Sequence, residues 1–555
     1  MHRLATLAVA FLAAGLSAQN LVATVDDPMS HGVLGDARLS LSEAILVLNG
    51  TVSLGSLSPS ERARIVGIGT TLDTIRIDAA QTPTITYERD LPPIAGQNNS
   101  GVTVRLLGLR ANGVAPTLLA GAVLTALEVR TNRIVVQGLQ IFGAAVGIDI
   151  ETSTNFVVGQ RGSLTDLALA GQTQSGMRLR THPLHPGSKV PFTIERTQLF
   201  GQPTGFEVLM EAPAGALEVV AELVTLTGCT VGAHLQSDGS GGRHSFELFR
   251  CAMTGGDHCI RLRRAIGNDT EWLVRTVYGP FMARHNVFDV EGSTAGADTI
   301  FHHHQLDIRA GAAPTDYALL AGPSGARFDL HTSENRYDGN ISIMSGRLSR
   351  RLWMHVNHFT NGTFDLENEG VRPDLQWNVF ESCPIRVAAT NRVTFPLLDC
   401  ELIRSPVTDL TAFGTTSLTN CFRASSSVTA NVVVQNPAPA RWLGQATVTP
   451  GDPPRGGFVD FGVDLQPGTA GVWYLGASEA RPVTSNYPFR FYLQLGGAVL
   501  IPGVFTDQGR FRLGIPNLPI MAGAEFFAQP LVVPIAGQTY VPPLSMPRGG
   551  RFKIV

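Results

Sequence analysis

Acidic and basic residues come together around position 260 of this 555-residue chain. Asp257 precedes a short segment in which Ile260 and Leu262 alternate with Arg261 and Arg263. Alternate side chains of a β-strand point to opposite faces, so the apolar pair is predicted inside and the two arginines outside. A carboxylate beside a guanidinium stays ionised and can bind Ca²⁺ or orient an acidic sugar. Asp257, Arg261 and Arg263 are therefore candidate catalytic residues, with Ca²⁺ as a candidate cofactor.

The surroundings of these residues allow two interpretations. In one, the arginines lie beside Gln236 and Asp238 in a groove walled by an insertion from Arg264 to His285. Trp272 and Tyr278 of that insertion are then candidate substrate-binding residues, because aromatic rings stack on sugars; the same loop could instead cover the side of the fold. In the other, the charges form a solvated surface ladder, worth at most about 1 kcal/mol.

Three consecutive histidines form a second candidate site. Neighbouring side chains of a strand point in opposite directions, so His302 and His304 can share a face while His303 cannot join them. Asp298 or Asp307 would complete a metal site of unknown specificity; the alternative is an ordinary packed or solvated strand.

The sequence contains no GxSxG, Walker or HExxH motif and no CxxC pair. Their absence argues against serine hydrolases of the GxSxG type, P-loop nucleotide binders and zinc sites of the HExxH or CxxC type.

The composition favours many short strands. Charged residues make up only 16% of the chain, while 59 glycines and 34 prolines supply turns. The net charge of −3 lacks the basic excess that nucleic-acid binding requires, so no nucleic-acid partner is expected.

A repeat is the clearest structural signal. It consists of a small polar residue, a variable residue and a large apolar residue, and its copies begin at Cys229, Cys251, Asn286, Asn335, Asn357, Asn378 and Cys400. Where no insertion intervenes, the distance along the sequence from one copy to the next falls within about 20 to 25 residues. A repeat of that length in a chain with the composition of β-strands predicts a solenoid. Leucine-rich repeats would show a leucine consensus, and a β-propeller would need a period about twice as long.

The polar residue of the repeat is predicted to stack on its equivalent in the next coil. Asn357 and Asn378 should lie in adjacent coils, because side-chain amides can bond to one another and to turn backbone groups. Cysteine is small enough for the same position, either as a disulfide or as packed thiols. The cysteine pairs expected to stack are Cys229 with Cys251 and Cys400 with Cys421.

With this repeat, the chain resembles the right-handed parallel β-helix superfamily of pectate lyases, polygalacturonases and many bacterial surface proteins. The resemblance covers roughly residues 75 to 430. Leu41-Ser42-Glu43-Ala44-Ile45 resembles the Leu-Arg-Glu-Ala-Ile core of a motif that precedes such helices in exported bacterial proteins, with serine in place of arginine. The same residues read as a short amphipathic helix, which would cap the open end of the solenoid.

The superfamily implies chemistry that this chain matches only in part. Its lyases use Ca²⁺-binding carboxylates with an arginine or lysine base, and its hydrolases use paired or triple aspartates. Asp257-His258-Cys259 resembles the Asp-Asp-Cys segment of polygalacturonases, with His258 replacing one aspartate. The accompanying Asn-Thr-Asp and Arg-Ile-Lys motifs are missing, so the hydrolase roles do not carry over.

The chain reads as an exported all-β protein: a right-handed parallel β-helix followed by a small β-sandwich. Arg3, the apolar run to Leu16 and the small Ala18 predict a secretory signal, the alternative being an uncleaved anchor. No later segment predicts a membrane span. With Gly471-Val472-Trp473-Tyr474-Leu475-Gly476 and Gly514-Ile515-Pro516-Asn517, the C-terminal part resembles a module of secreted proteins from Planctomycetes-type bacteria. The predicted boundaries are 1–18 for the signal peptide, 19–75 for the cap region, 76–431 for the β-helix, 432–439 for a linker and 440–555 for the sandwich.

These observations predict a secreted or cell-surface protein, expected as a monomer, that binds or presents to extracellular polysaccharide. One alternative is a polysaccharide lyase or glycoside hydrolase acting in the groove around Asp257. Another is a structural adhesin or envelope protein. An enzyme needs clustered carboxylates and a base beside a cleft, a binding protein needs exposed aromatic residues, and a structural protein needs neither.

Overall fold

The computed structural model separates the chain into two compact units, which are described in turn. The first comprises Met1–Thr299 with Gly322–Ala326, and the second Ile300–Ala321 with Arg327–Val555. The described residues are 21–30, 35–67, 72–96, 103–182, 189–210, 216–237, 242–264, 270–284, 287–290, 298–309, 315–316, 328–333, 335–345, 349–368, 373–389, 394–411, 415–437, 446–449, 453–463, 469–476, 499–501, 511–519, 522–534 and 550–554. The predicted signal peptide lies outside them.

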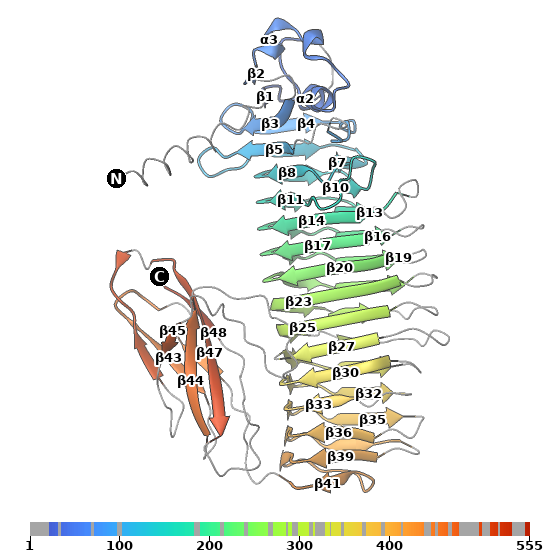
Figure 1. The fold of residues 1–555 in the computed structure, drawn as a ribbon, viewed down its shortest axis with the longest axis vertical. Coiled ribbons are helices and arrows are strands. Elements are labelled where there is room, and N and C mark those ends of the chain that lie inside the picture. Colours follow the sequence, from blue (N-terminus) through green and yellow to red (C-terminus); the bar gives the residue numbers. More distant parts are fainter. Residues whose placement is uncertain are drawn as a thin grey trace, which may run out of the picture. The chain divides into compact units, whose positions relative to one another are not determined.

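The first unit is a parallel β-helix whose coils add strands to three stacks (Figure 1). The first stack contains β1 (Leu21–Val25), β3 (Leu72–Asp78), β5 (Val104–Leu109), β8 (Ile134–Gln137), β11 (Gly162–Thr165), β14 (Lys189–Glu195), β17 (Ala216–Glu222), β20 (Gly242–Phe249) and the start of β23 (Thr270–Ala283). The second contains β4 (Thr84–Tyr87), β6 (Thr117–Ala120), β9 (Gln140–Gly143), β12 (Ala168–Ala170), β15 (Gln198–Phe200), β18 (Thr225–Thr227), β21 (Ala252–Gly256) and the end of β23. The third contains β7 (Thr125–Val129), β10 (Val146–Glu151), β13 (Ser175–Arg180), β16 (Thr204–Met210), β19 (Val231–Ser237), β22 (His258–Arg264) and β24 (Phe288–Val290).

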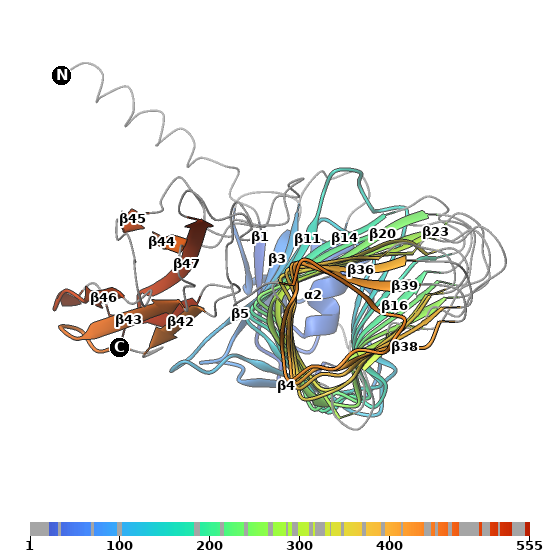
Figure 2. The ribbon, with the colours of Figure 1, turned by 90° about the horizontal axis from the view of Figure 1, so that it is seen from below.

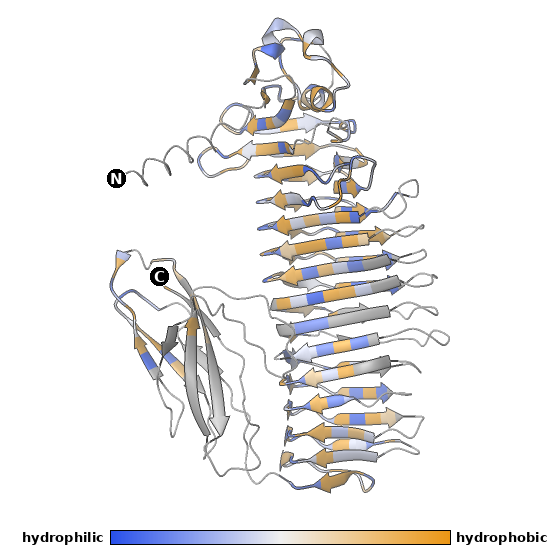
Figure 3. Cartoon of the chain, in the orientation of Figure 1, coloured by the Kyte–Doolittle hydropathy of each residue, from blue (hydrophilic) through white to orange (hydrophobic). Residues whose placement is uncertain are grey.

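Apolar and polar residues alternate along strands of this unit (Figure 3), and the apolar residues build its core. An inward-pointing residue of each second-stack strand stacks on its equivalent in the next coil. These inward residues are at most 1% exposed: Leu118, Ile141, Leu169, Leu199, Leu226 and Met253. Burial of such columns is the main favourable contribution to the fold.

The second unit continues the same pattern with its own coils. Its first stack contains β27 (Phe328–Ser333), β30 (Ser349–His355), β33 (Asp374–Gln376), β36 (Thr394–Leu398), β39 (Thr415–Thr419) and β41 (Val433–Gln435). Its second contains the end of β25 (Asp298–Arg309), β28 (Arg336–Asp338), β31 (His358–Thr360), β34 (Val379–Glu381), β37 (Glu401–Ile403) and β40 (Phe422–Ala424). Its third contains β26 (Thr315–Asp316), β29 (Ile341–Ser345), β32 (Phe364–Asn368), β35 (Ile385–Ala389) and β38 (Val407–Asp409).

Coil length differs between the two units. In the second unit, Ile341 pairs with Phe364 and Phe364 pairs with Ile385, so its coils have the short period that the repeat predicts. In the first unit, Val146 pairs with Ser175 and Ser175 pairs with Thr204, so these coils contain more residues than those of the second unit. The period read from the sequence therefore describes the later coils of the second unit and an early coil of the first, where Thr125 pairs with Val146.

The predicted asparagine ladder is confirmed. Asn357 Nδ2 donates to Asn378 Oδ1 at 3.1 Å, and Asn335 Nδ2 donates to Asn357 Oδ1 at 3.1 Å. All three side chains are buried at the corner between the first and second stacks. Cys400 and Cys421 extend the ladder in register, and both carry buried free thiols.

The predicted pairing of Cys229 with Cys251 is wrong. Thr225 pairs with Ala252, so Cys251 takes the corner between the first and second stacks. Cys229 follows β18 and lies at the corner between the second and third stacks. Both are free, as are all six cysteines.

The predicted N-terminal helix is present as α2 (Leu41–Leu48), followed by η1 (Leu54–Ser56), α3 (Pro59–Arg62) and β2 (Ile65–Val66). Ser40 and Glu43 form a capping box at its start. The helix packs on β1 and β3, and Figure 2 shows it within the outline of the first unit's coils, as a cap would lie. Asn49 links the C-terminal end of α2 to the segment after β4, because Ala95 N and Gly96 N both donate to Asn49 Oδ1 at 3.0 Å.

The C-terminal part of the second unit holds two antiparallel sheets. One contains β42 (Ala446–Thr449), β43 (Phe458–Val463) and β46 (Phe511–Gly514). The other contains β45 (Val499–Ile501), β44 (Thr469–Gly476), β47 (Glu525–Pro534) and β48 (Gly550–Lys553). The all-β character is confirmed; the sandwich and the five boundaries stay predictions. In the part of the chain that the structure describes, no helix is long and apolar enough to cross a membrane.

Candidate functional site

The structure orients the predicted catalytic residues as strand parity requires. Ile260 and Leu262 of β22 are fully buried, and Arg261 and Arg263 lie on the outer face of the third stack. Arg263 is in register with Gln236, as expected, and Arg261 is in register with His234.

The predicted pairing of Asp257 with Arg261 is absent. Arg261 Nη2 lies 2.8 Å from His258 Nε2, while Asp257 is fixed through its backbone N–H, which donates to Thr230 O at 2.9 Å. Neither an ion pair nor a side-chain hydrogen bond holds the Asp257 carboxylate among the described residues. Catalysis by these residues therefore stays a prediction, and the ion pair between Asp257 and Arg261 that suggested it is not present.

The predicted insertion is part of the solenoid wall. Residues 270–283 form β23, which pairs with β20 and then with β21. Trp272 is fully buried, with its ring 4.7 Å from that of His244, so its assignment to sugar stacking is wrong. Tyr278 lies in β23, but its side chain is outside the described residues.

The histidine segment follows its predicted parity. His303 is fully buried, and burial lowers its pKa to about 3. His302 points outward and stacks on His331, with ring centroids 4.7 Å apart and planes 5° from parallel. Parallel stacking does not converge ring nitrogens on one ion. The side chain of His304 is outside the described residues, and so the metal site stays a prediction.

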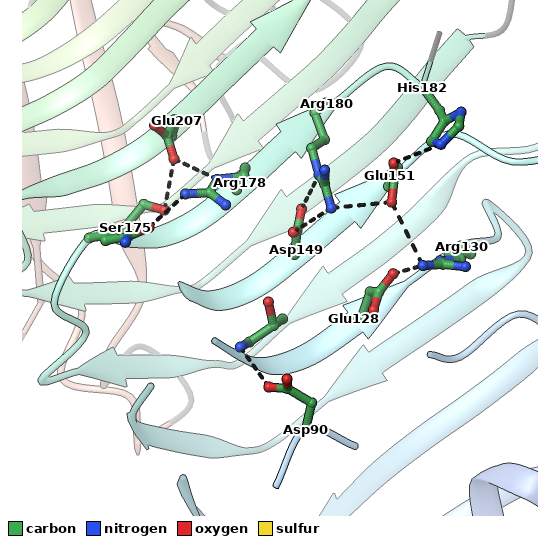
Figure 4. A network of polar contacts seen from close by, with 12 residues as sticks. Asp90, Glu128, Arg130, Asp149, Glu151, Ser175, Arg178, Arg180, His182 and Glu207 are labelled. Atoms are coloured by element: carbon green, nitrogen blue, oxygen red, sulfur yellow. Dashed lines mark hydrogen bonds and ion pairs between the residues drawn. The ribbon is translucent and has the colours of Figure 1, made fainter. Parts of the chain in front are cut away.

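The outer face of the third stack carries an ion-pair network (Figure 4). Arg180 Nη2 lies 3.1 Å from Asp149 Oδ2 and 3.2 Å from Glu151 Oε2, and His182 Nε2 lies 3.6 Å from Glu151 Oε1. One coil on, Arg178 pairs with Glu207 at 2.7 Å. Asp149 is 3% exposed, and burial raises its pKa although Arg180 acts in the opposite direction.

These ion pairs satisfy one another. Every labelled acid of the network except Asp90 has a guanidinium or imidazole partner, and Asp90 accepts from the Leu124 backbone N–H at 3.0 Å. In these coils the charges form a structural ladder, while the interpretation of the charges around Asp257 stays open.

The outer face of the second stack in the first unit is different, because it is uncharged between β6 and β21. We name it the second-stack face. One of its two columns contains Thr117, Gln140, Ala168, Gln198, Thr225 and Ala252. The other contains Leu119, Phe142, Ala170, Phe200, Thr227 and Thr254.

Two similar motifs stand two coils apart on this face. Gln140-Ile141-Phe142 and Gln198-Leu199-Phe200 flank the small segment Ala168-Leu169-Ala170. Phe142 and Phe200 are 37% and 40% exposed, which is unusual for large apolar side chains on one column. Strand spacing places them about 10 Å apart with only a methyl group between. The sequence interpretation missed this face, although each motif is followed by glycine, the repeated signal that could have revealed it.

A smaller aromatic group lies on the outer face of the first stack in the second unit. Trp353 is 40% exposed and its ring lies 4.4 Å from that of His331, tilted by 42°. His355 Nε2 pairs with Asp374 Oδ2 at 3.2 Å beside it.

Comparison with protein-family models finds no match, and neither does a search of curated proteins. The parallel β-helix is therefore shown by strand pairing alone.

Proposed function

We propose that this chain is a secreted or cell-surface protein that binds an uncharged extracellular polysaccharide along its second-stack face. The observation that carries the proposal is the two-coil repeat of an exposed phenylalanine beside a glutamine. A glycan chain lying across the coils would meet the same pair of side chains at alternate sugar rings.

The spacing supports an extended ligand. Phe142 and Phe200 lie about 10 Å apart, two strand spacings, which suits alternate rings of an extended glycan. Ala168 and Ala170 between them leave room for the intervening sugar. Because the strands themselves set the spacing, the site is rigid before the ligand binds, which lowers the entropic cost of binding.

The chemistry supports an uncharged ligand. Phenylalanine rings stack on the C–H face of a pyranose, and the amides of Gln140 and Gln198 both donate and accept hydrogen bonds to hydroxyl groups. Thr117, Thr225 and Thr227 add hydroxyl groups along the same face. An acidic polymer would gain no charge pairing on this face.

Binding is tested with the full mature chain by affinity electrophoresis in gels that contain xylan, mannan, β-glucan, pectin or alginate. We expect retardation by at least one neutral polymer. Phe142→Ala and Phe200→Ala should each weaken it about threefold to tenfold, which corresponds to one lost ring contact. Leu124→Ala removes a more exposed apolar side chain outside the face and should change nothing.

Other outcomes overturn the proposal. Unchanged binding in the double phenylalanine variant would remove the second-stack face as the site. Loss of binding in Trp353→Ala but not in that variant would assign it to the second unit. Release of unsaturated or reducing ends, abolished by Asp257→Asn, would favour the lyase or hydrolase alternative.

A further inference from the structure

The cap region holds three carboxylates at one point. Asp36, Glu43 and Glu61 each offer an oxygen, and these oxygens all lie within 4.8 Å of one another. Glu43 and Glu61 are 0% exposed, whereas Asp36 lies on the exposed loop before α2. Buried carboxylates normally carry a partner of opposite charge. Among the described residues, no guanidinium or ammonium pairs with Glu43 or Glu61.

Local folding explains how the two glutamates come to face each other. Each is the third residue of a short helix and closes a capping box: Ser40 N donates to Glu43 Oε2 at 2.8 Å, and Ser58 N donates to Glu61 Oε2 at 2.6 Å. The loop before α2 is bound to the second helix, because Gly35 N and Asp36 N donate to Glu61 Oε1 at 2.8 and 3.1 Å.

One buried oxygen of this group has no partner. Glu43 Oε1 accepts no hydrogen bond and forms no ion pair with any of the described residues. This oxygen belongs to a cluster of three carboxylates, so the site is suited to a cation.

We propose that Asp36, Glu43 and Glu61 bind one Ca²⁺ ion, which ties the loop before α2 to both helices of the cap. Calcium takes only oxygen ligands, at about 2.4 Å, so two ligands on opposite sides of the ion are about 4.8 Å apart. Mg²⁺ binds oxygen at about 2.1 Å and needs a tighter, octahedral site. Backbone carbonyls and water complete the coordination of Ca²⁺ in such sites.

The test is calorimetric titration of CaCl₂ into the full mature chain after treatment with EDTA. We expect one ion per chain, with a Kd of about 10⁻⁴ to 10⁻³ M, the range of extracellular calcium modules. The Tm should rise in excess CaCl₂ and should rise less in the same concentration of MgCl₂. Glu43→Gln should weaken Ca²⁺ binding at least tenfold and abolish that rise, while the exposed Glu88→Gln should leave both unchanged.

Glutamine also fits the third position of a capping box, so Glu43→Gln is expected to fold, which circular dichroism in EDTA verifies. If it does not fold, Asp36→Asn on the exposed loop decides, and it should weaken Ca²⁺ binding as well. No Ca²⁺-dependent heat in the wild type, or unchanged affinity in the folded variants, would overturn the proposal and assign a proton to Glu43.

Discussion

The asparagine ladder allows a prediction whose size follows from its hydrogen bonds. Asn357 is 1% exposed, and its Oδ1 accepts from both Asn335 N and Asn335 Nδ2 at 3.1 Å. Its Nδ2 donates to Asn378 Oδ1 and to Thr332 Oγ1, both at 3.1 Å. Asn357→Ala removes all of these bonds and leaves the backbone N–H of Asn335 buried without an acceptor.

The expected loss of stability is about 3 kcal/mol, because the orphaned N–H alone costs about 1–3 kcal/mol, and the other bonds contribute about 0.5–1.5 kcal/mol each, part of which relaxation recovers. Cys400 and Cys421 occupy the same position in the following coils, so Asn357→Cys should fit and lose less. The exposed Asn340 Oδ1 accepts from Thr363 N at 2.8 Å and from Thr363 Oγ1 at 3.3 Å, both open to water, and Asn340→Ala should lose under about 1 kcal/mol.

Native-state amide hydrogen exchange is the appropriate assay, because long repeat arrays need not unfold in two states. A loss of about 3 kcal/mol corresponds to about a hundredfold faster exchange at the Asn335 amide. If Asn357→Ala leaves that amide as protected as Asn340→Ala does, the ladder contributes no more than a surface bond and the reasoning is refuted.

Two further predictions concern the first unit. Gly143→Ala should lower the free energy of unfolding by about 1–3 kcal/mol more than Gly113→Ala, as measured by thermal unfolding. The two glycines have φ of 81° and 82°, so the backbone strain is the same. A Cβ at Gly143 would overlap with the Ala120 carbonyl oxygen, whereas nothing lies near Gly113. Arg180→Met should cost about 2 kcal/mol at pH 7, since it leaves a buried aspartate unpaired, although the arginine is a third exposed. The deficit exists only while Asp149 is ionised, and losing Arg180 raises the pKa of Asp149 further than burial already does in the wild type. Urea melts should therefore show the full deficit above the variant's Asp149 pKa and a shrinking deficit as the pH falls below it. Equal costs for the two glycines, or a deficit that grows in acid, would contradict these accounts.

Strand parity and the repeat could be read from the sequence where the same residue recurs. Ile260 and Leu262 are placed inside by alternation alone, and both are buried. Asn357 and Asn378 are placed in adjacent coils because only a stacking role explains the same amide one repeat apart.

The register of the first unit could not be read in the same way. A small residue followed by an inward-pointing apolar residue occurs wherever a turn leads into a strand. Cys229 and Cys251 therefore have the same sequence pattern, although they lie at different corners of the coil. Trp272 looks like part of an insertion because no such marker follows it. The corner there is Gly279, where a Cβ would overlap with the Cys251 carbonyl oxygen.

The second-stack face and the carboxylate cluster of the cap region could not be predicted from the sequence, because each brings together residues that are distant along the chain. The two Gln-x-Phe motifs are distant in sequence and become neighbours only once the coil length is known. Glu43 and Glu61 each read as a helix-capping residue, and only the packing of α2 near α3 turns two caps into one cluster.

The six buried thiols have a consequence for how the chain reaches its folded state. Burial raises the pKa of Cys251 to about 12 and that of Cys229 to about 11, so the folded protein presents almost no reactive thiolate to oxidants. Mispaired disulfides can therefore form only before the coils close over the cysteines. If the chain is exported to an oxidising environment, faster folding would therefore reduce this damage. Once folded, the protein is indifferent to the redox state of its surroundings.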